Sequence, residues 1–215
     1  MRNRTDARYT WVKNTVKSMI ENNLTEEKKE IRKRILEKRN LLNKEERLRA
    51  RILLTERILG HQWFYCSEIL LAFASYGSEI ETEEVIREAL RQGKSVFLPK
   101  VITDTFLKEP YMEFFRINNI EELEPGYRKI PEPSLKNEKY VYDEKDAAKT
   151  LMLMPGVAFD RYRNRIGYGK GFYDRFLEDK EKLQLRTIGI GFQCQLEEKI
   201  PVDERDIRPS QVICV

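Results

Sequence analysis

The sequence has little of the side-chain chemistry on which many hydrolases and zinc proteins rely. Its 215 residues include a single histidine, His61, and three cysteines. One imidazole argues against a histidine-based zinc site and against a histidine-dependent catalytic triad. The cysteines Cys66, Cys194 and Cys214 are odd in number and contain no Cys-x-x-Cys pair, which suits a reducing cytoplasm. Because Cys66 and Cys214 lie in or beside apolar runs, we expect both to be small buried thiols.

Long apolar segments are missing as well. No apolar run approaches the roughly 18 residues that a membrane-spanning helix needs, and the N-terminal residues lack the apolar core of a secretion signal. Hydrophobic residues make up 40% of the chain and charged residues 35%, as in a soluble protein. We therefore expect a cytoplasmic protein without a membrane partner. A chain of this length can bury one sizeable core, so one α/β domain is favoured over two.

The most informative segment is Arg161–Asp174, with the sequence RYRNRIGYGKGFYD. It places three glycines at alternate positions and leads into a predicted helix at Phe172–Leu177. Glycines let backbone N–H groups approach a ligand closely, and a helix N-terminus attracts anions. Asp174 suits such a site if a divalent cation lies between its carboxylate and phosphate groups. Positive charge comes from Arg161, Arg163, Arg165 and Lys170. The pattern favours a magnesium nucleotide as the ligand.

This segment differs from the two common nucleotide fingerprints. Lys170 is followed by Gly171, whereas a Walker A motif requires Ser or Thr there, and the glycines do not have G-x-G-x-x-G spacing. On loop chemistry alone, a tight surface turn with solvated arginines is the alternative. The upstream run Leu151–Asp160 is apolar and contains Pro-Gly, which predicts a buried strand leading into the loop.

The string MPGVAFDRYRNRIGYGKGFYDRFL closely resembles the signature of the 5-formyltetrahydrofolate cyclo-ligase family, also called methenyltetrahydrofolate synthetase. Members carry PG-x-x-FD, a short spacer and R-L-G-x-G-x-G-Y-Y-D; here Ile166 and Phe172 replace the usual Leu and first Tyr. The resemblance extends from about Glu27 to the C-terminus. It implies a ligase of one-carbon metabolism that cyclises 5-formyltetrahydrofolate to 5,10-methenyltetrahydrofolate. The implied reaction needs Mg²⁺, phosphorylates the formyl oxygen with ATP, and releases ADP and phosphate.

The resemblance also implies roles for individual residues. Lys28 and Arg32 match the family's K-x-x-x-R, and their spacing places both on one helical face. The implied ATP-binding residues are Lys28, Arg32, Arg165, Gly167, Tyr168, Gly169, Lys170, Gly171, Phe172 and Tyr173. The implied substrate contacts are Glu79, Phe73, Tyr168 and Phe172, the implied metal ligands are Asp174 and Asp206, and the implied catalytic residues are Lys170, Arg165 and Tyr173. On composition alone, Glu79 and Asp206 would be solvated loop carboxylates.

Two other functions stay open. A nucleotide-binding paralogue on the same scaffold could lack folate cyclisation, given the two departures in the motif and the additional N-terminal residues. A basic nucleic-acid-binding module is the second, because residues 1–60 contain 17 lysines and arginines against 9 aspartates and glutamates. No recognised nucleic-acid-binding motif is present, and the aromatic residues are not interleaved with the basic run. We therefore expect a monomer that binds folate and ATP and no nucleic acid.

Hydrophobic periodicity predicts the remaining architecture. Residues 1–24 are expected to be a poorly ordered or loosely helical extension, followed by a single domain at 25–215. Thr25 is predicted to cap a helix carrying Ile31 and Ile35. Asn43 and Glu46 are predicted to form a capping box for a second helix, whose apolar stripe comprises Leu48, Ile52, Ile58 and Leu59.

The middle of the chain alternates between predicted strands and helices. Strands are predicted at 68–76, 95–101, 111–117, 186–192 and 211–215, with a helix at 81–91 and a possible cap at Thr82. Residues 118–149 are expected to form a surface excursion with a short helix near 120–123. The strand–helix–strand order predicts a parallel crossover. We therefore predict a three-layer α/β/α sandwich on a largely parallel, Rossmann-like sheet, as the family resemblance also implies.

Overall fold

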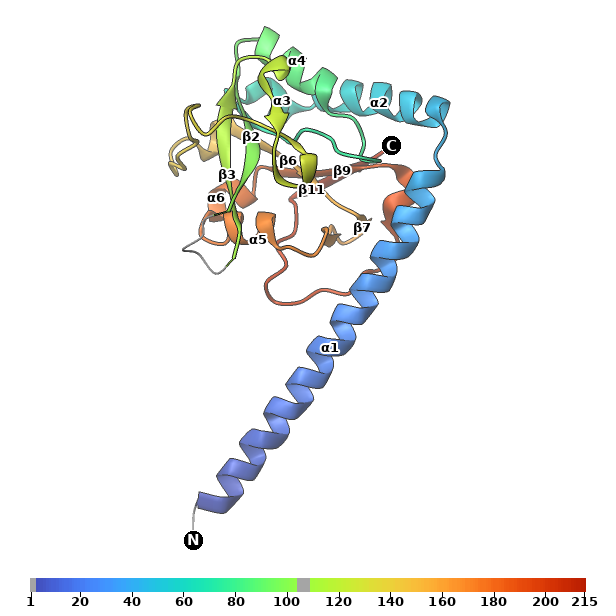
Figure 1. The fold of residues 1–215 in the computed structure, drawn as a ribbon, viewed down its shortest axis with the longest axis vertical. Helices are drawn as coiled ribbons and strands as arrows, with labels where there is room; N and C mark the ends of the chain where they lie inside the picture. The colour runs from blue at the N-terminus through green and yellow to red at the C-terminus, as the bar shows by residue number, and fades with distance from the viewer. Residues whose placement is uncertain (1–2, 104–108) are drawn as a thin grey trace.

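A six-stranded sheet forms the centre of the protein (Figure 1). The computed structural model describes the backbone of residues 3–103 and 109–215, and the side chains in these ranges from residue 22 onward. The strand order is β11-β9-β6-β1-β2-β3, and only the β2–β3 pair is antiparallel. The strands are β1 Ile69–Leu71, β2 Ser95–Ile102, β3 Tyr111–Ile117, β6 Thr150–Pro155, β9 Thr187–Gly191 and β11 Gln211–Cys214. The predicted parallel crossover from β1 to β2 is confirmed.

Helices cover both faces of this sheet. They are α1 Asn3–Leu41, α2 Lys44–Leu59, α3 Gln62–Cys66, α4 Glu83–Arg91, α5 Phe172–Leu177 and α6 Glu181–Gln184. Leu70 and Leu151 face the core shared with α2 and α4, whereas their neighbours Leu71 and Met152 face the core shared with α5 and α6. The alternation follows from the two-residue period of a strand. The three-layer α/β/α architecture is therefore confirmed.

In the part of the chain that the structure describes, two small sheets and four 3₁₀ turns lie outside the central sheet. They are β4 Glu124–Pro125 with β5 Pro131–Glu132, β10-β7-β8 (Leu196–Glu197, Ala158–Asp160, Arg165–Ile166), and turns at Ile120–Glu122, Tyr127–Lys129, Ala147–Lys149 and Gln193–Gln195. The predicted strand Leu151–Asp160 is therefore divided into β6 and β7. Gly156 lies at the break, where an added Cβ would be 2.4 Å from Cζ of the Phe159 ring. The antiparallel β7–β8 pair then leads the chain into the glycine-containing segment.

The predicted start of the N-terminal helix at Thr25 is wrong. The helix α1 is continuous from Asn3 to Leu41 and extends away from the sheet as a long rod (Figure 1). Thr25 lies inside this helix and therefore does not cap it, because an N-cap residue has non-helical backbone angles. Ile31 and Ile35 are buried on the face that meets the domain, as expected. The side chains of residues 1–21 lie outside the described part of the chain.

The second helix begins as predicted, and its predicted stripe is right at Ile58 and Leu59, which meet the core, but wrong at Leu48 and Ile52. Asn43 and Glu46 form the capping box, in which the Asn43 side chain accepts from the backbone N–H of Glu46 and the Glu46 side chain accepts from that of Asn43. The residues buried in α2 are Ala50, Leu54 and Ile58, whereas Leu48 and Ile52 are about half exposed. Ala50 was missed because a small residue contributes little to an apolar stripe, and the true stripe has strict four-residue spacing.

Three smaller expectations need correction. The strand predicted at 68–76 is limited to Ile69–Leu71. Thr82 occupies the cap position of α4, but its hydroxyl donates to the Phe73 carbonyl and does not cap the helix. Cys66 is exposed, because α3 ends there at the surface, whereas Cys214 is buried as expected. No helix in the described residues is long and apolar enough to cross a membrane.

Candidate nucleotide and folate site

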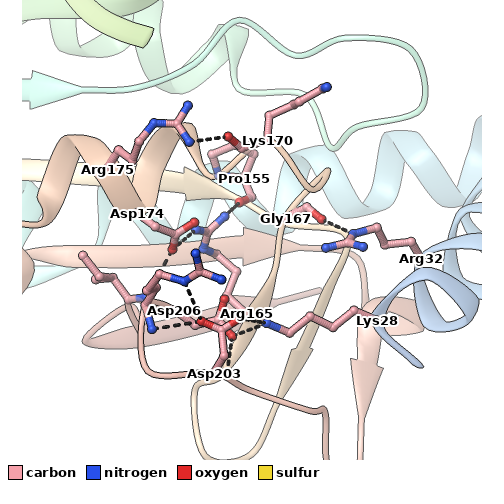
Figure 2. Close-up of polar contacts among 12 residues, drawn as sticks. Lys28, Arg32, Pro155, Arg165, Gly167, Lys170, Asp174, Arg175, Asp203 and Asp206 are labelled. Atoms are coloured by element: carbon pink, nitrogen blue, oxygen red, sulfur yellow. Dashed lines mark hydrogen bonds and ion pairs between the residues drawn. The ribbon is translucent and has the colours of Figure 1, made fainter. Parts of the chain in front are cut away.

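A cavity of about 840 Å³ opens beyond the C-terminal end of β6. Its walls come mainly from α1, from the loop 167–171 between β8 and α5, here called the glycine loop, and from residues 203–206. Figure 2 shows cationic and carboxylate side chains from all three segments around the cavity. The volume is within the range of small-molecule sites. Every predicted ATP-binding and metal-binding residue lines this cavity.

The glycine loop has a backbone conformation and close neighbours that leave little room for side chains at its glycine positions. Gly169 and Gly171 have φ angles of +87° and +61°, in the left-handed region that favours glycine. A Cβ at Gly169 would lie 3.4 Å from Cζ of Arg32, and a Cβ at Gly167 would lie 2.9 Å from Nη1 of Arg165. The loop therefore lies directly against two guanidinium groups, and its glycines keep that approach open.

Two cations reach the cavity from consecutive turns of α1. Arg32 donates from Nε to the Gly167 carbonyl at 2.7 Å. Burial lowers the pKa of Arg32, and the charge of Asp206 acts in the opposite direction. Lys28 is 7% exposed and forms ion pairs with Asp206 and, at 2.9 Å, with Oδ2 of Asp203. The prediction that Lys28 and Arg32 share one face of the helix is therefore confirmed. Their role in ATP binding stays a prediction.

Three aspartate carboxylates line the same cavity, and two of them, Asp203 and Asp206, pair with Lys28. Asp203 donates its backbone N–H to Oδ2 of Asp206 at 2.8 Å. Burial alone would raise the pKa of Asp203, but hydrogen bonds from Lys28 and from the Arg205 N–H hold it below its usual value. Asp174 accepts through Oδ1 from Nη2 of Arg165 at 2.9 Å and from the Ile207 N–H at 3.1 Å. The structure thus brings Asp174 and Asp206 to one side of the cavity.

Further cations line the cavity from the glycine loop, from α5 and from residues 203–206, namely Lys170, Arg175 and Arg205. The Lys170 ammonium forms no ion pair with any described residue, and Figure 2 shows the side chain extending away from the carboxylates. Arg175 donates to the Lys170 carbonyl at 2.8 Å and to the Pro110 carbonyl at 3.2 Å. Arg175 therefore ties the glycine loop to the segment that precedes β3 and leaves the Lys170 side chain available to a ligand.

Aromatic side chains form the less polar part of the lining. Phe172 meets Tyr127 edge-to-face with ring centroids 6.2 Å apart. Tyr173 has the Arg165 guanidinium 5.6 Å from its ring centroid, and burial raises its pKa well above the usual value. Tyr168 is about half exposed, and its hydroxyl accepts from Arg39 at 2.7 Å. These rings offer an apolar surface beside the phosphate-sized, charged part of the cavity.

Four residues singled out in the sequence do not line the cavity. Glu79 lies behind the glycine loop near Tyr168, where its carboxylate accepts from the Tyr76 N–H at 2.9 Å. Phe73 is 4% exposed and belongs to the hydrophobic core. Arg161 pairs with Tyr162, and Arg163 donates to the Ser210 carbonyl at 2.7 Å. Arg161 and Arg163 are therefore corrected from ligand-facing cations to residues that make local contacts.

Sequence reasoning missed Asp203, Arg175 and Tyr127 as lining residues. Asp203 and Arg175 lie close in the sequence to Asp206 and Asp174, so their nearness to predicted site residues could have indicated that they line the cavity. Tyr127 lies in the segment 118–149 that was expected to be a surface excursion. A Pro-Gly turn before it is the only local sign, and Arg128 and Lys129 adopt positive φ angles there. Such backbone strain is invisible in a single sequence.

Comparisons with known proteins agree with the motif. The sequence model of the 5-formyltetrahydrofolate cyclo-ligase family matches residues 24–215. A mouse protein named 5-formyltetrahydrofolate cyclo-ligase is 28% identical over 200 residues, covering 86% of this chain and 92% of its own length. A Caenorhabditis elegans protein named probable 5-formyltetrahydrofolate cyclo-ligase is 33% identical over 180 residues, which are 80% of this chain and 84% of that protein.

The fold agrees with a solved structure as well. The NMR structure of 5,10-methenyltetrahydrofolate synthetase from Aquifex aeolicus superposes with a TM-score of 0.72 at 28% sequence identity. The match covers 87% of this chain and 89% of that one. The mixed α/β fold with its mostly parallel central sheet is therefore shared with that synthetase.

Proposed function

The chain belongs to the 5-formyltetrahydrofolate cyclo-ligase family and is a ligase of that family, and on this basis we propose that it forms 5,10-methenyltetrahydrofolate from 5-formyltetrahydrofolate with ATP and Mg²⁺. The observation that carries the proposal is one cavity in which α1, the glycine loop and residues 203–206 combine unobstructed backbone, cations and carboxylates. A magnesium nucleotide needs all three features, because its phosphates bind cations and N–H groups whereas its metal binds oxygen ligands.

The nucleotide would bind with its phosphates against the glycine loop. Lys28 and Arg32 reach the cavity from one side, and Arg165 and Lys170 from the other. Lys170 forms no ion pair with a described residue, and the Arg165 side chain is 3% exposed with a buried Nε that lacks a hydrogen-bond partner. A preorganised set of cations stabilises the negative charge that shifts between oxygens during phosphoryl transfer.

Asp174 and Asp206 are the proposed metal ligands. No group of three or more His, Cys, Asp or Glu side chains in the described residues is arranged to hold a metal by itself. Mg²⁺ does not need such a group, because it is commonly held by one or two carboxylates, water and substrate phosphates. Lys28 pairs with both Asp203 and Asp206, so it can retain Asp203 if Asp206 binds a cation. When bound, the metal would neutralise charge on the phosphates.

The proposed chemistry requires no protein nucleophile. The formyl oxygen attacks the γ-phosphorus and ADP leaves. N10 then attacks the formyl carbon and gives up its proton to solvent or to the leaving phosphate, and the carbon–oxygen bond breaks to release inorganic phosphate. The protein has to align the formyl oxygen with the γ-phosphate and exclude competing water. Tyr168, Phe172 and Tyr173 supply a partly apolar wall for the folate beside the phosphate-binding cations. Glu79 does not line this cavity, so the proposed contact between its carboxylate and a polar edge of the folate requires the folate to extend past Tyr168.

Methenyltetrahydrofolate formation should depend on both ATP and a divalent metal. We expect protein treated with EDTA to lose at least about 99% of its turnover, because unshielded phosphates would repel Asp174 and Asp206. Product is followed by its absorbance, and added Mg²⁺ should restore the rate, which controls for damage by the chelator. An undiminished rate in chelator would show that these two carboxylates do not serve a metal.

Replacement of Glu79 should separate the folate site from the nucleotide site. We expect Glu79→Gln to raise KM for 5-formyltetrahydrofolate roughly tenfold or more, because it removes a charge-assisted hydrogen bond, and to change ATP affinity less than about twofold. Glu81→Gln is the matched control, since Glu81 lies two residues away and pairs with Arg51 at the surface. Equal losses of affinity for 5-formyltetrahydrofolate and ATP, at unchanged thermal stability, would contradict separate folate and nucleotide sites.

A further inference from the structure

A buried arginine lies directly behind the cavity without lining it. Arg39, in the last turn of α1, is 2% exposed. It donates from Nη2 to the Tyr168 hydroxyl at 2.7 Å and from Nε to Oγ of Ser78 at 3.0 Å. Its Cζ lies 5.7 Å from the centroid of the Tyr168 ring. Burial of an arginine is costly unless its charge and its donors are satisfied, so this side chain is held by specific partners.

The partner charge is the Glu79 carboxylate, which reaches Arg39 through Tyr168. The Tyr168 hydroxyl accepts a hydrogen bond from Arg39, and burial together with the charge of nearby Glu79 raises the pKa of Tyr168. Because the guanidinium can only donate, the Tyr168 hydroxyl keeps its own proton to offer to the Glu79 carboxylate. Burial raises the pKa of Glu79, while the Tyr76 N–H, the Tyr168 hydroxyl and the charge of Arg39 act in the opposite direction. The three groups therefore form an electrostatically coupled set in which Arg39 donates to Tyr168 and Tyr168 lies between Arg39 and Glu79.

A second arginine holds the first in place. Arg47 of α2 donates from Nη2 to the Arg39 carbonyl at 2.5 Å, from Nη1 to the Ser78 carbonyl at 3.1 Å, and from Nε to the Leu42 carbonyl at 3.1 Å. It thus joins the end of α1 to the segment after β1 that carries Ser78 and Glu79. The planar fork of arginine suits such simultaneous bonding. With Arg39 reaching Tyr168, three segments far apart in the sequence meet at one point.

We infer that Arg39 is a positioning residue for the folate: it holds the Tyr168 hydroxyl and the Glu79 carboxylate in one fixed arrangement at the back of the cavity. The inference rests on the proposed function, and it adds a residue outside the cavity to the machinery for substrate recognition. Arg39 acts only through these two groups. Its loss should therefore weaken the use of folate selectively, because the phosphate-binding cations are held by other contacts.

The test compares Arg39→Met and Arg39→Lys with wild type and with Arg34→Met. Arg34 is on the same helix, pairs with Glu197 at the surface and lies outside the cavity, so its variant should keep wild-type kinetics. For Arg39→Met we expect KM for 5-formyltetrahydrofolate to rise about tenfold or more, the range for a charge-assisted hydrogen bond, with KM for ATP within about twofold. Arg39→Lys should recover thermal stability more than it recovers KM, because an ammonium lacks the two-donor fork.

A double substitution distinguishes positioning from simple structural support. If Arg39 acts through the Tyr168 hydroxyl, Arg39→Lys should have little further effect on the KM for folate once Tyr168→Phe is present. The inference would be overturned if the effects of Arg39→Lys and Tyr168→Phe on the KM for folate multiplied independently. Equal rises in the KM values for folate and ATP would overturn it as well. If Arg39→Met fails to fold, the Arg39→Lys and Tyr168→Phe pair decides alone. Absence of methenyltetrahydrofolate formation in the wild type would instead refute the proposed function, which keeps the two failures distinct.

Discussion

Replacing Lys170 by methionine is expected to lower kcat for methenyltetrahydrofolate formation by at least about 100-fold, the usual loss when a group that stabilises transition-state charge is removed. Lys170 is the lining cation of the glycine loop, and its ammonium forms no ion pair with any described residue. Arg165, by contrast, is already paired with Asp174. The available charge of Lys170 is therefore the one most directly offered to a phosphate.

The same reasoning predicts a normal fold in this variant. Arg175 holds the loop through the Lys170 carbonyl, a backbone contact that methionine preserves. The melting temperature should stay near that of the wild type. Lys29→Met is the matched control, because Lys29 is exposed on α1 and pairs with Glu26, and its kcat should stay within about twofold of wild type. Wild-type kcat in Lys170→Met would remove this lysine from the catalytic assignment.

The elements that were predicted well are those whose signals are local. The apolar strands, the capping box at Asn43 and the helix after Gly171 depend on neighbouring residues. All are present, although the strand predicted at 68–76 is shorter and the one at 151–160 is divided. Thr25 shows where local signals mislead: Thr followed by Glu is typical of a helix start, yet the segment before it is also helical, so no cap is needed. The buried face of α2 depends on what packs against it, and the pattern of exposed leucines could not reveal that.

The residues of the site also fall into those that local sequence patterns predict and those that they do not. The motif from Arg165 to Asp174 is contiguous, so its convergence on one cavity could be predicted, and Lys28 with Arg32 followed from helical spacing. Contacts between distant segments could not. The two ion pairs of Lys28 span more than 170 residues, and Arg39 reaches Tyr168 across 129. Such contacts depend on how the helical layers pack against the sheet. No short pattern in a single sequence reveals that packing.

A valine at Gly169 should abolish detectable nucleotide binding, with a loss in affinity of at least about 100-fold. The backbone there has a φ of +87°, and an added Cβ would already lie 3.4 Å from the Arg32 guanidinium. The larger side chain would displace Arg32 and block the approach of a phosphate to the loop backbone. The backbone strain should also cost about 1–2 kcal/mol of folding stability, so binding must be measured by calorimetry with an ATP analogue well below the melting temperature.

Gly93→Val provides the control that separates strain from obstruction. Gly93 also has a positive φ of +75°, but nothing lies within 4 Å of an added Cβ, and it follows α4 away from the cavity. We expect this variant to lose similar stability and to keep wild-type affinity. Gly169→Ala should fall between Gly169→Val and wild type, since its methyl group meets Arg32 at van der Waals distance. If Gly169→Val bound the analogue as tightly as wild type, the phosphates would have to bind elsewhere, and the glycine loop would be an ordinary turn.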